Sequence, residues 1–252
     1  MGEILKFEHY SLSFEKKGNL SPILQDVSFS VKEGSLVAIV GRSGSGKTLL
    51  LRSILRLPGT MARRSGTILF KGEDLDSKTE KEMREVRGGK IGMIFQDPVA
   101  SLSPLMKIGK QIVEVACLHR PTLSPLLARE KAERLFDLVG IDRPKMRMNQ
   151  YPFELSGGQC QRVCIAIALI TGPSLLLADE PTTALDVTTA RQIMKLFMKI
   201  KKELGMTILF VTHNLHLIRD YGDEILMLSG GSITETLTGK DELTNEALYA
   251  RS

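Results

Sequence analysis

One glycine-rich segment, placed between an apolar run and a helix-like run, constrains the fold of this chain more than any other feature. Leu36–Val40 is a compact apolar run that fits a buried parallel strand. It is followed by Gly41–Thr48, which reads GRSGSGKT and matches the pattern G-x-x-x-x-G-K-[ST] in full. Thr48–Leu57 then has helical character. The sequence therefore predicts a strand–loop–helix unit whose glycines let backbone amides turn toward phosphate oxygens.

The end of this loop carries two side chains suited to a nucleoside triphosphate. The Lys47 ammonium is expected to reach the outer phosphates, and the Thr48 hydroxyl is expected to bind Mg²⁺. The N-terminus of the helix adds unpaired amides and a partial positive charge. The predicted nucleotide contacts in this segment are Gly41, Ser43, Gly44, Ser45, Gly46, Lys47, Thr48 and Leu49.

Strand-like and helix-like runs alternate along the chain, which is typical of an α/β fold with a mostly parallel sheet. The first 36 residues instead indicate an N-terminal antiparallel β part, because Lys6–Phe14 and Val27–Val31 alternate polar and apolar residues. A helix is predicted over Val187–Leu204, capped by Asp186 and ended by Gly205. Further strands are predicted at Thr67–Phe70, Ile91–Phe95, Leu175–Ala178 and Thr207–Val211, with a terminal hairpin of Glu224–Leu228 and Ser232–Thr236 around Gly230-Gly231.

The composition and the apolar pattern of the sequence change between Asp97 and Ser156. Prolines recur there, at positions 98, 104, 121, 125, 144 and 152, and the runs Ile108–Leu118 and Leu126–Val139 have helical spacing. We therefore predict one domain, in which residues 1–96 and 157–252 form the core and residues 97–156 form an inserted helical subdomain.

Composition limits the classes of function. No run of about 18 apolar residues is present, and the N-terminus lacks a signal-peptide layout, so we expect a protein on the cytosolic side. The net charge of +5 is spread along the chain without interleaved aromatic residues, which favours a solvated surface over a nucleic-acid interface. The three cysteines, Cys117, Cys160 and Cys164, are an odd count without paired spacing, which argues against a disulfide framework. Cys160 and Cys164 are interpreted as two reduced core or semi-core thiols, with a metal site as the alternative.

A second anion-binding element is predicted at Leu155–Gln159, which reads LSGGQ. Ser156 is a good N-cap and Gln159 stands three residues later, which is the capping-box pattern for a helix running to about Ile170. Two glycines at the helix start permit close approach of an anion to the bare N-terminus. This pentapeptide resembles the signature of the ABC ATPase family.

Leu175–Glu180, which reads LLLADE, resembles the family's Walker B segment. The apolar run brings two carboxylates to a strand end. Asp179 is expected to hold Mg²⁺, through water, and Glu180 to polarise the attacking water as general base.

The other motifs of the family follow in the same order. Gln96 resembles the Q-loop glutamine, Ala184–Asp186 resembles the D-loop, and His213 resembles the switch histidine. Phe14 is the best match for the aromatic residue that stacks on adenine, with Tyr10 as its rival. The resemblance covers nearly the whole chain.

The resemblance implies a P-loop NTPase core that binds ATP and Mg²⁺ and works as a dimer. In the family, the signature of one subunit faces the phosphate loop of the other, so two ATP molecules are held between two chains. Catalysis is then assigned to Glu180, His213 and Lys47, with charge stabilisation by the partner's Ser156 and the partner's Gly158.

As a member of this family, the chain is expected to be the peripheral ATPase of a transporter, on the cytoplasmic face of the inner membrane. Its implied partners are two membrane permease subunits, a second ATPase subunit, identical or different, and indirectly an external substrate-binding protein. No nucleic-acid partner is expected. The segment after Gln96 is expected to form the permease docking groove with the helical insertion.

The segments Gln96–Leu105 and Ile108–Ile112, with Tyr151-Pro152 and Pro181–Asp186, resemble the oligopeptide, dipeptide and nickel importer branch. Many members continue past the final hairpin with a His-Pro-Tyr-Thr-like segment and a longer tail, which are absent here. This resembles the shorter nickel-type or metallophore-type members, and a reduced tail is the equal alternative. The sequence does not decide whether the transported substrate is a peptide or a metal complex, or whether transport is import or export.

Two other classes of function compete with transport. Chromosome-maintenance and repair ATPases place long coiled coils between phosphate loop and signature, whereas about a hundred residues lie there in this chain. Ribosome-acting cassette proteins carry two cassettes, and this chain has one. A regulatory or iron–sulfur assembly cassette is disfavoured by the importer-like segment Gln96–Gln111.

Overall fold

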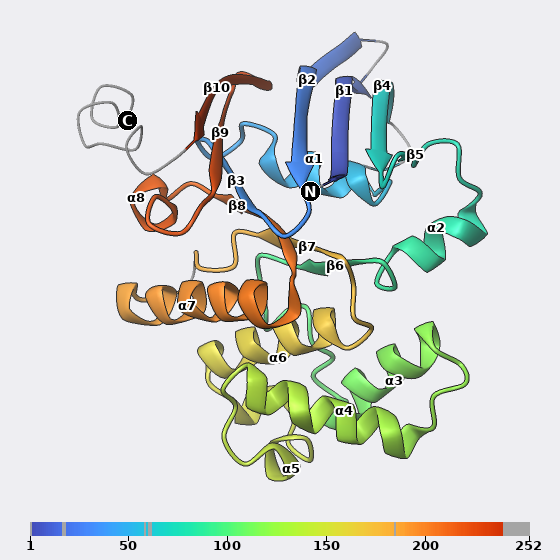
Figure 1. The fold of residues 1–252 in the computed structure, drawn as a ribbon, viewed down its shortest axis with the longest axis vertical. Coiled ribbons are helices and arrows are strands. Elements are labelled where there is room, and N and C mark those ends of the chain that lie inside the picture. Colours follow the sequence, from blue (N-terminus) through green and yellow to red (C-terminus); the bar gives the residue numbers. More distant parts are fainter. Residues whose placement is uncertain (1, 17–18, 58, 60–61, 184, 239–252) are drawn as a thin grey trace. The chain divides into compact units, whose positions relative to one another are not determined.

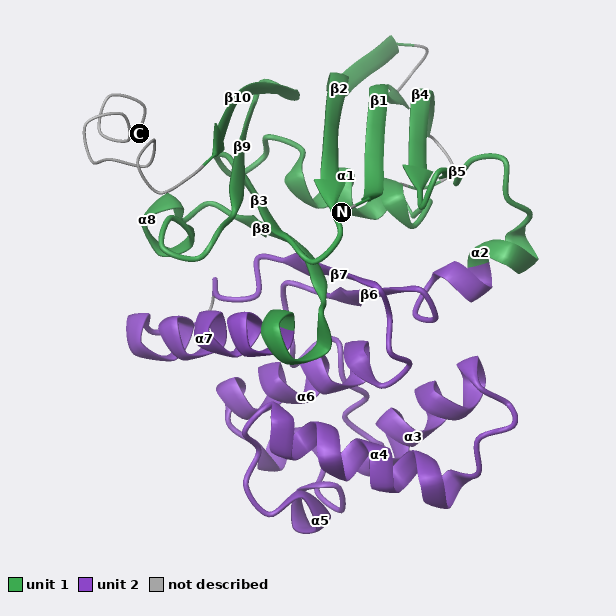
Figure 2. Cartoon of the chain, viewed as in Figure 1, with its two compact units in different colours: residues 1–83, 201–252 green, residues 84–200 purple. Residues whose placement is uncertain are grey.

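A computed structural model of the protein describes residues 2–16, 19–57, 59, 62–183 and 185–238. The chain forms two compact units (Figure 2). Unit 1 combines residues 1–83 with residues 201–252, and unit 2 comprises residues 84–200. The chain passes between them within α2 (Glu80–Val86) and within α7 (Val187–Leu204). The helical subdomain predicted over residues 97–156 has other boundaries than unit 2, and that division of the chain stays a prediction.

Unit 1 contains the predicted antiparallel β part as a sheet of order β2-β1-β4-β5 (Figure 1). Its strands are β1 (Glu3–Lys16), β2 (Asn19–Lys32), β4 (Ala62–Phe70) and β5 (Glu73–Asp74). Phe7 and Tyr10 meet edge to face on its buried side, with ring centroids 5.5 Å apart. Such aromatic pairs add to the stabilisation that burial gives.

The parallel strands of unit 1 carry the phosphate-loop segment. β3 (Leu36–Val40) lies between β8 (Thr207–Thr212) and β9 (Glu224–Ser229) and is parallel to both. β10 (Ser232–Thr238) closes the predicted hairpin, antiparallel to β9. All residues of β3 and β8 are buried, which explains their continuous apolar sequence. The α/β fold with parallel strands is confirmed.

Unit 2 contains one parallel strand pair and most of the helices. β6 (Ile91–Ile94) pairs with β7 (Leu175–Asp179). The helices α3 (Ile108–His119), α4 (Pro125–Leu138) and α6 (Gly157–Leu169) pack against one another, and α6 also packs against β6. Small buried residues such as Ala116, Ala128 and Ala132 allow the helices to approach. Short helical turns complete the unit at α5 (Pro144–Arg147) and at Pro152–Glu154.

The helix after the phosphate loop ends earlier than predicted. α1 spans Lys47–Ile54 and does not reach Leu57. The Arg56 amide donates to the Ser53 carbonyl at 2.9 Å and the Leu57 amide donates to the Arg52 carbonyl at 2.8 Å. These two bonds form a Schellman motif, with Arg56 at φ 53° where glycine is usual.

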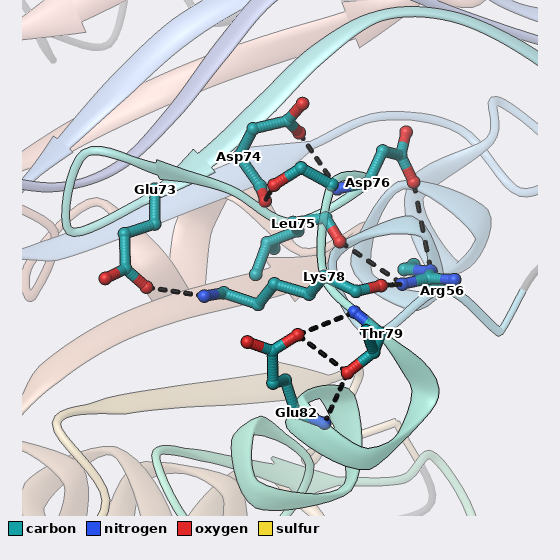
Figure 3. Close-up of polar contacts among 9 residues, drawn as sticks. Arg56, Glu73, Asp74, Leu75, Asp76, Lys78, Thr79 and Glu82 are labelled. Atoms are coloured by element: carbon teal, nitrogen blue, oxygen red, sulfur yellow. Dashed lines mark hydrogen bonds and ion pairs between the residues drawn. The ribbon is translucent and has the colours of Figure 1, made fainter.

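A polar network holds that arginine (Figure 3). One Arg56 nitrogen, Nη1, donates to the carbonyls of Leu75 at 3.3 Å and Lys78 at 2.6 Å. Next along the chain, the Thr79 amide and hydroxyl both donate to Glu82 Oε2, at 2.8 and 2.7 Å, and so cap α2. The network therefore connects the end of α1 to the segment that leads into α2.

The helices α2 and α8 (Leu215–Ile218), and strand β5, were not predicted, because each is too short for periodicity to be visible.

Among the described ranges, no helix combines the length and apolar character needed to cross a membrane. The burial predicted for two of the cysteines is confirmed, since Cys160 and Cys164 are buried free thiols in α6, whereas Cys117 is half-buried. Burial raises the pKa of the Cys164 thiol to about 12. The described residues contain no cluster of three or more metal-ligating side chains.

Candidate active site

The phosphate loop joins the end of β3 to the start of α1 in unit 1, as predicted. Gly46 is the N-cap of α1, at φ 100°, and no side chain of the described residues caps the helix there. The first amides of α1 are therefore not engaged by a capping side chain, which is the arrangement that favours an anion at a helix N-terminus.

Close approach of neighbouring atoms, of the backbone at Gly41 and of a buried leucine side chain at Gly46, explains two of the loop glycines. A Cβ on Gly41 would lie 2.3 Å from the Leu228 carbonyl oxygen, and one on Gly46 would lie 2.9 Å from Leu24 Cδ2. A Cβ on Gly44, at φ 83°, would meet no atom of the described residues within 4 Å. Gly41 and Gly46 are thus required by space, whereas Gly44 is required by its backbone angle alone.

Lys47 folds back on the loop that precedes it. Its side chain is 4% exposed, and Nζ donates to the carbonyls of Gly41 at 2.8 Å and Arg42 at 2.9 Å. Within the described part of the chain, Ser45 Oγ is buried and lacks a hydrogen-bond partner. Buried polar atoms are normally satisfied, so this hydroxyl indicates a missing polar partner inside the loop. A phosphate oxygen fits that requirement.

The loop lines a cavity of about 480 Å³ in unit 1. The phosphate loop lines it with Gly41, Ser43, Gly44 and Ser45. The rest of the lining was not predicted from the sequence and includes Pro22, Ile23, Met227 of β9 and the β9–β10 turn, Gly230-Gly231. The turn is fixed to β2, because the Gln25 amide donates to the Gly231 carbonyl at 2.8 Å. The Gly230-Gly231 pair signalled a hairpin, but nothing in the sequence placed that hairpin beside the loop.

The two aromatic candidates for adenine differ in accessibility. Tyr10 is completely buried, and this burial raises the pKa of its phenol. Phe14 is half-buried, on β1 opposite Ser21 of β2 and Ala62 of β4. Phe14 does not line the cavity described above. Tyr10 belongs to the core, so Phe14 stays as the predicted adenine contact.

His213 follows β8 and shares a sheet edge with the phosphate loop. The register pairs Val40 with Thr212, so His213 and Gly41 both come directly after the carboxyl ends of adjacent parallel strands. The His213 side chain is exposed. Asn214 then caps α8, because its Oδ1 accepts from the Leu217 amide at 3.0 Å. The switch-histidine role assigned to His213 stays a prediction.

In unit 2, the Walker B segment forms the end of β7. Asp179 closes the strand at 1% exposure, and Glu180 follows it at φ 44°. Gln96 lies at the same edge, since β6 and β7 are parallel and Ile94 pairs with Ala178. Unit 2 therefore brings together two of the predicted acidic residues and the predicted Q-loop glutamine.

The Thr183 side chain contacts the predicted general base. Its hydroxyl donates to Glu180 Oε2 at 2.7 Å, and its amide donates to the Glu180 carbonyl at 3.2 Å. Sequence reasoning assigned no role to Thr183. A threonine three residues after a carboxylate is a weak signal, since Asp186 and Thr189 have the same spacing and cap α7.

The capping box predicted for the signature helix is confirmed. The Gln159 amide donates to Ser156 Oγ at 3.3 Å, and the Ser156 amide donates to Gln159 Oε1 at 3.0 Å. Ser156 and Gly157 are exposed, and a Cβ on Gly157 would meet nothing within 4 Å. The N-terminus of α6 is thus open to a ligand from outside the chain.

The D-loop is described in part, because Ala184 lies outside the described residues. Asp186 caps α7 as predicted, accepting from the Thr189 amide at 3.0 Å and from the Thr189 hydroxyl at 2.6 Å. These bonds, first that from the hydroxyl, lower the pKa of the Asp186 carboxyl.

Comparisons with known proteins place this geometry in a family. Residues 24–183 match the family model described as ABC transporter. The chain is 45% identical over 239 residues to the oligopeptide transport ATP-binding protein OppD of Bacillus subtilis, covering 93% of this chain and 66% of that protein. It is 40% identical over 243 residues to the dipeptide transport ATP-binding protein DppD of the same organism, covering 96% of this chain and 72% of that protein.

A solved structure agrees with these relatives. It is a dimeric ATP-binding cassette in a post-hydrolysis state, bound to ADP and Pi. Its TM-score with this chain is 0.82 at 30% identity, over 93% of this chain and 98% of that one. This chain spans just under two thirds of the length of the OppD relative. On the family model and these identities, the chain belongs to the ABC transporter family.

Proposed function

We propose that this chain is the ATP-binding and ATP-hydrolysing subunit of a peptide importer, acting on membrane permeases that are separate polypeptides. The observation that carries the proposal is the phosphate loop on β3 and α1, in a chain 45% identical to an oligopeptide transport ATP-binding protein. The Ser45 hydroxyl of this loop is buried and has no hydrogen-bond partner among the described residues. The relatives named above are peptide transport proteins, which favours peptides over nickel as cargo.

The residues of the phosphate loop bind and orient ATP in this proposal. Loop amides and the N-terminus of α1 hold the phosphates, and Lys47 exchanges the carbonyls of Gly41 and Arg42 for phosphate oxygens. Thr48 and Asp179 offer the oxygen ligands that Mg²⁺ prefers. When bound, the metal neutralises phosphate charge during transfer.

Glu180 acts as the general base. As the water oxygen bonds to the γ-phosphorus, its proton passes to the Glu180 carboxylate, and the bond from the γ-phosphorus to the bridging oxygen breaks to release ADP. His213 and Gln96 sense the γ-phosphate. The exposed N-terminus of α6 supplies Ser156 and its amides to the ATP of a second cassette subunit.

Exposed apolar side chains in unit 2 support a permease docking surface. Leu105, in the segment after Gln96, is 87% exposed, and Phe153 is 75% exposed while it stacks on Tyr151. Val99 and Leu118 are also exposed. Exposed apolar side chains of this kind mark protein interaction sites when they gather into a patch. The proposed location is therefore the cytoplasmic face of the membrane, where the chain is held by permeases.

Replacing Glu180 by glutamine tests the catalytic assignment. We expect E180Q to bind ATP as the wild type does and to lose ATP turnover by about 10²-fold or more, because the amide cannot accept the proton. The matched control is E203Q, which makes the same change at an exposed position of α7. Steady-state turnover and ATP binding are measured for both, and turnover of E180Q within a few-fold of wild type contradicts the assignment.

Isolating the chain with its partners tests transport. We expect the tagged protein, recovered from detergent-solubilised membranes of its own cells, to bring two multi-span permeases and a second cassette subunit, identified by mass spectrometry. A peptide-binding protein encoded or recovered with them supports peptide import. Recovery of soluble partners alone contradicts the transporter and leaves only the ATPase activity.

A further inference from the structure

The turn after β7 holds its glutamate in an unusual backbone conformation. Glu180 adopts φ 44°, in the left-handed region, where a residue with a Cβ is less stable by roughly 1–2 kcal/mol. Strain of this kind persists when surrounding contacts determine it, and it gathers at functional sites. The contacts that determine the conformation of Glu180 are therefore candidates for a functional role.

Thr183 makes two of those contacts, one to the backbone and one to the side chain of Glu180. Its amide closes the turn onto the Glu180 carbonyl at 3.2 Å, and its hydroxyl donates to Glu180 Oε2 at 2.7 Å. Between them, Pro181 and Thr182 are buried, which fixes the middle of the turn. A β-branched threonine has few χ1 rotamers, so its hydroxyl is a well-placed donor.

We propose that Thr183 is a positioning residue for ATP hydrolysis: its hydroxyl holds one carboxylate oxygen of Glu180 so that the other is presented to the attacking water. This inference rests on the proposed role of Glu180 as general base. As the water oxygen bonds to the γ-phosphorus, the water's proton passes to the Glu180 carboxylate and the bond from the γ-phosphorus to the bridging oxygen breaks; Thr183 keeps its own proton throughout.

The chain contains the same contact in a purely structural setting. In the cap of α2, the Thr79 hydroxyl donates to Glu82 Oε2, also at 2.7 Å and also three residues apart (Figure 3). There the Glu82 amide donates in return to Thr79 Oγ1 at 3.3 Å, which completes a capping box. Thr79–Glu82 is therefore an internal control: it has the same hydroxyl–carboxylate contact as Thr183–Glu180, but it serves only to cap a helix.

The test compares T183V, T183S and T79V for ATP turnover, the KM for ATP and thermal stability. We expect T183V to lower kcat about tenfold with the KM within about twofold of wild type, as for loss of one hydrogen bond to a charged group. T183S restores the hydroxyl and is expected to recover kcat to within about twofold. T79V is expected to lower the melting temperature and leave kcat unchanged.

A double variant keeps this proposal distinguishable from the assignment of Glu180 itself. If Thr183 acts through Glu180, the turnover of E180Q/T183V equals that of E180Q. Wild-type kcat in T183V, or a kcat loss that T183S does not recover, overturns the positioning role while a large E180Q defect keeps the proposed function. A small E180Q defect overturns the proposed function instead.

Discussion

The phosphate loop and the turn after β7 both use the left-handed backbone region, but they use it with different residues. In the loop, the positive φ angles belong to Gly44 at 83° and Gly46 at 100°. In the turn, a φ of 44° belongs to Glu180. Glycine adopts such angles without the penalty that a Cβ brings. The loop presents its backbone to a ligand, so side chains would obstruct it, whereas the turn presents a carboxylate and must keep its side chain despite the strain.

The largest effect on ATP binding is expected from Gly46→Ala, which tests whether the phosphate loop, unlike the turn at Glu180, excludes a side chain. The new Cβ would lie 2.9 Å from Leu24 Cδ2 and 3.3 Å from the Ile23 carbonyl oxygen, at a φ that alanine rarely adopts. To relieve both the close contacts and the backbone strain, the start of α1 would have to move, and Lys47 would move with it. We therefore expect G46A to abolish measurable ATP binding, as followed by isothermal titration calorimetry.

Gly44→Ala is the control, because it shares the unfavourable φ but has open space around the added Cβ. The strain of roughly 1–2 kcal/mol then acts alone, and we expect ATP binding to weaken by about tenfold. Equal ATP affinity in G46A and wild type would show that the loop tolerates side chains, which would remove the distinction between the two regions.

The parts of the site that are continuous in sequence could be predicted. The loop from Gly41 to Thr48, the capping box of Ser156 and Gln159, and the strand that ends at Asp179 each have their signal within a few residues. Local patterns were sufficient there because a loop, a helix start and a strand end depend on neighbouring residues. The cavity wall formed by Pro22, Ile23 and the β9–β10 turn depends on contacts more than 200 residues apart, such as that from Gln25 to Gly231.

Backbone irregularities hid two other features. In β1, the pairing with both neighbours shifts between residues 7 and 12, where His9 adopts φ 50°. This bulge changes which side chains face inward, so Phe7 and Tyr10 are both buried although they are three residues apart. Simple alternation could not decide between Tyr10 and Phe14. The end of α1 was hidden likewise, because the usual signal of a C-terminal glycine is replaced by Arg56.

A smaller effect, on stability, is expected from replacing Arg56, a residue with positive φ that lies outside the candidate site. This replacement tests whether such residues are kept for their side chains, as we argue for Glu180. Its φ of 53° resembles that of Glu180, and its guanidinium donates to the carbonyls of Leu75 and Lys78. If strained residues are kept for their side chains, replacement by glycine relieves the backbone and still destabilises the fold. We expect R56G to lower the free energy of unfolding by about 1–2 kcal/mol in urea denaturation, since the lost bonds outweigh the relief.

Lys71→Gly is the matched control, because Lys71 also has φ 53° and its backbone amide, which donates to the Ile4 carbonyl at 2.8 Å, is kept in glycine. The Lys71 side chain is exposed, and among the described residues its one contact is distant, 6.0 Å from the ammonium to the Phe70 ring centroid. Here the relief and the greater entropy of the unfolded glycine chain oppose each other, so we expect a change within about 0.5 kcal/mol. An R56G variant as stable as K71G would mean that the Arg56 hydrogen bonds drawn in Figure 3 contribute nothing measurable. Strain alone would then not indicate a useful side chain, and the case for Glu180 would depend on its chemistry and on the contact from Thr183.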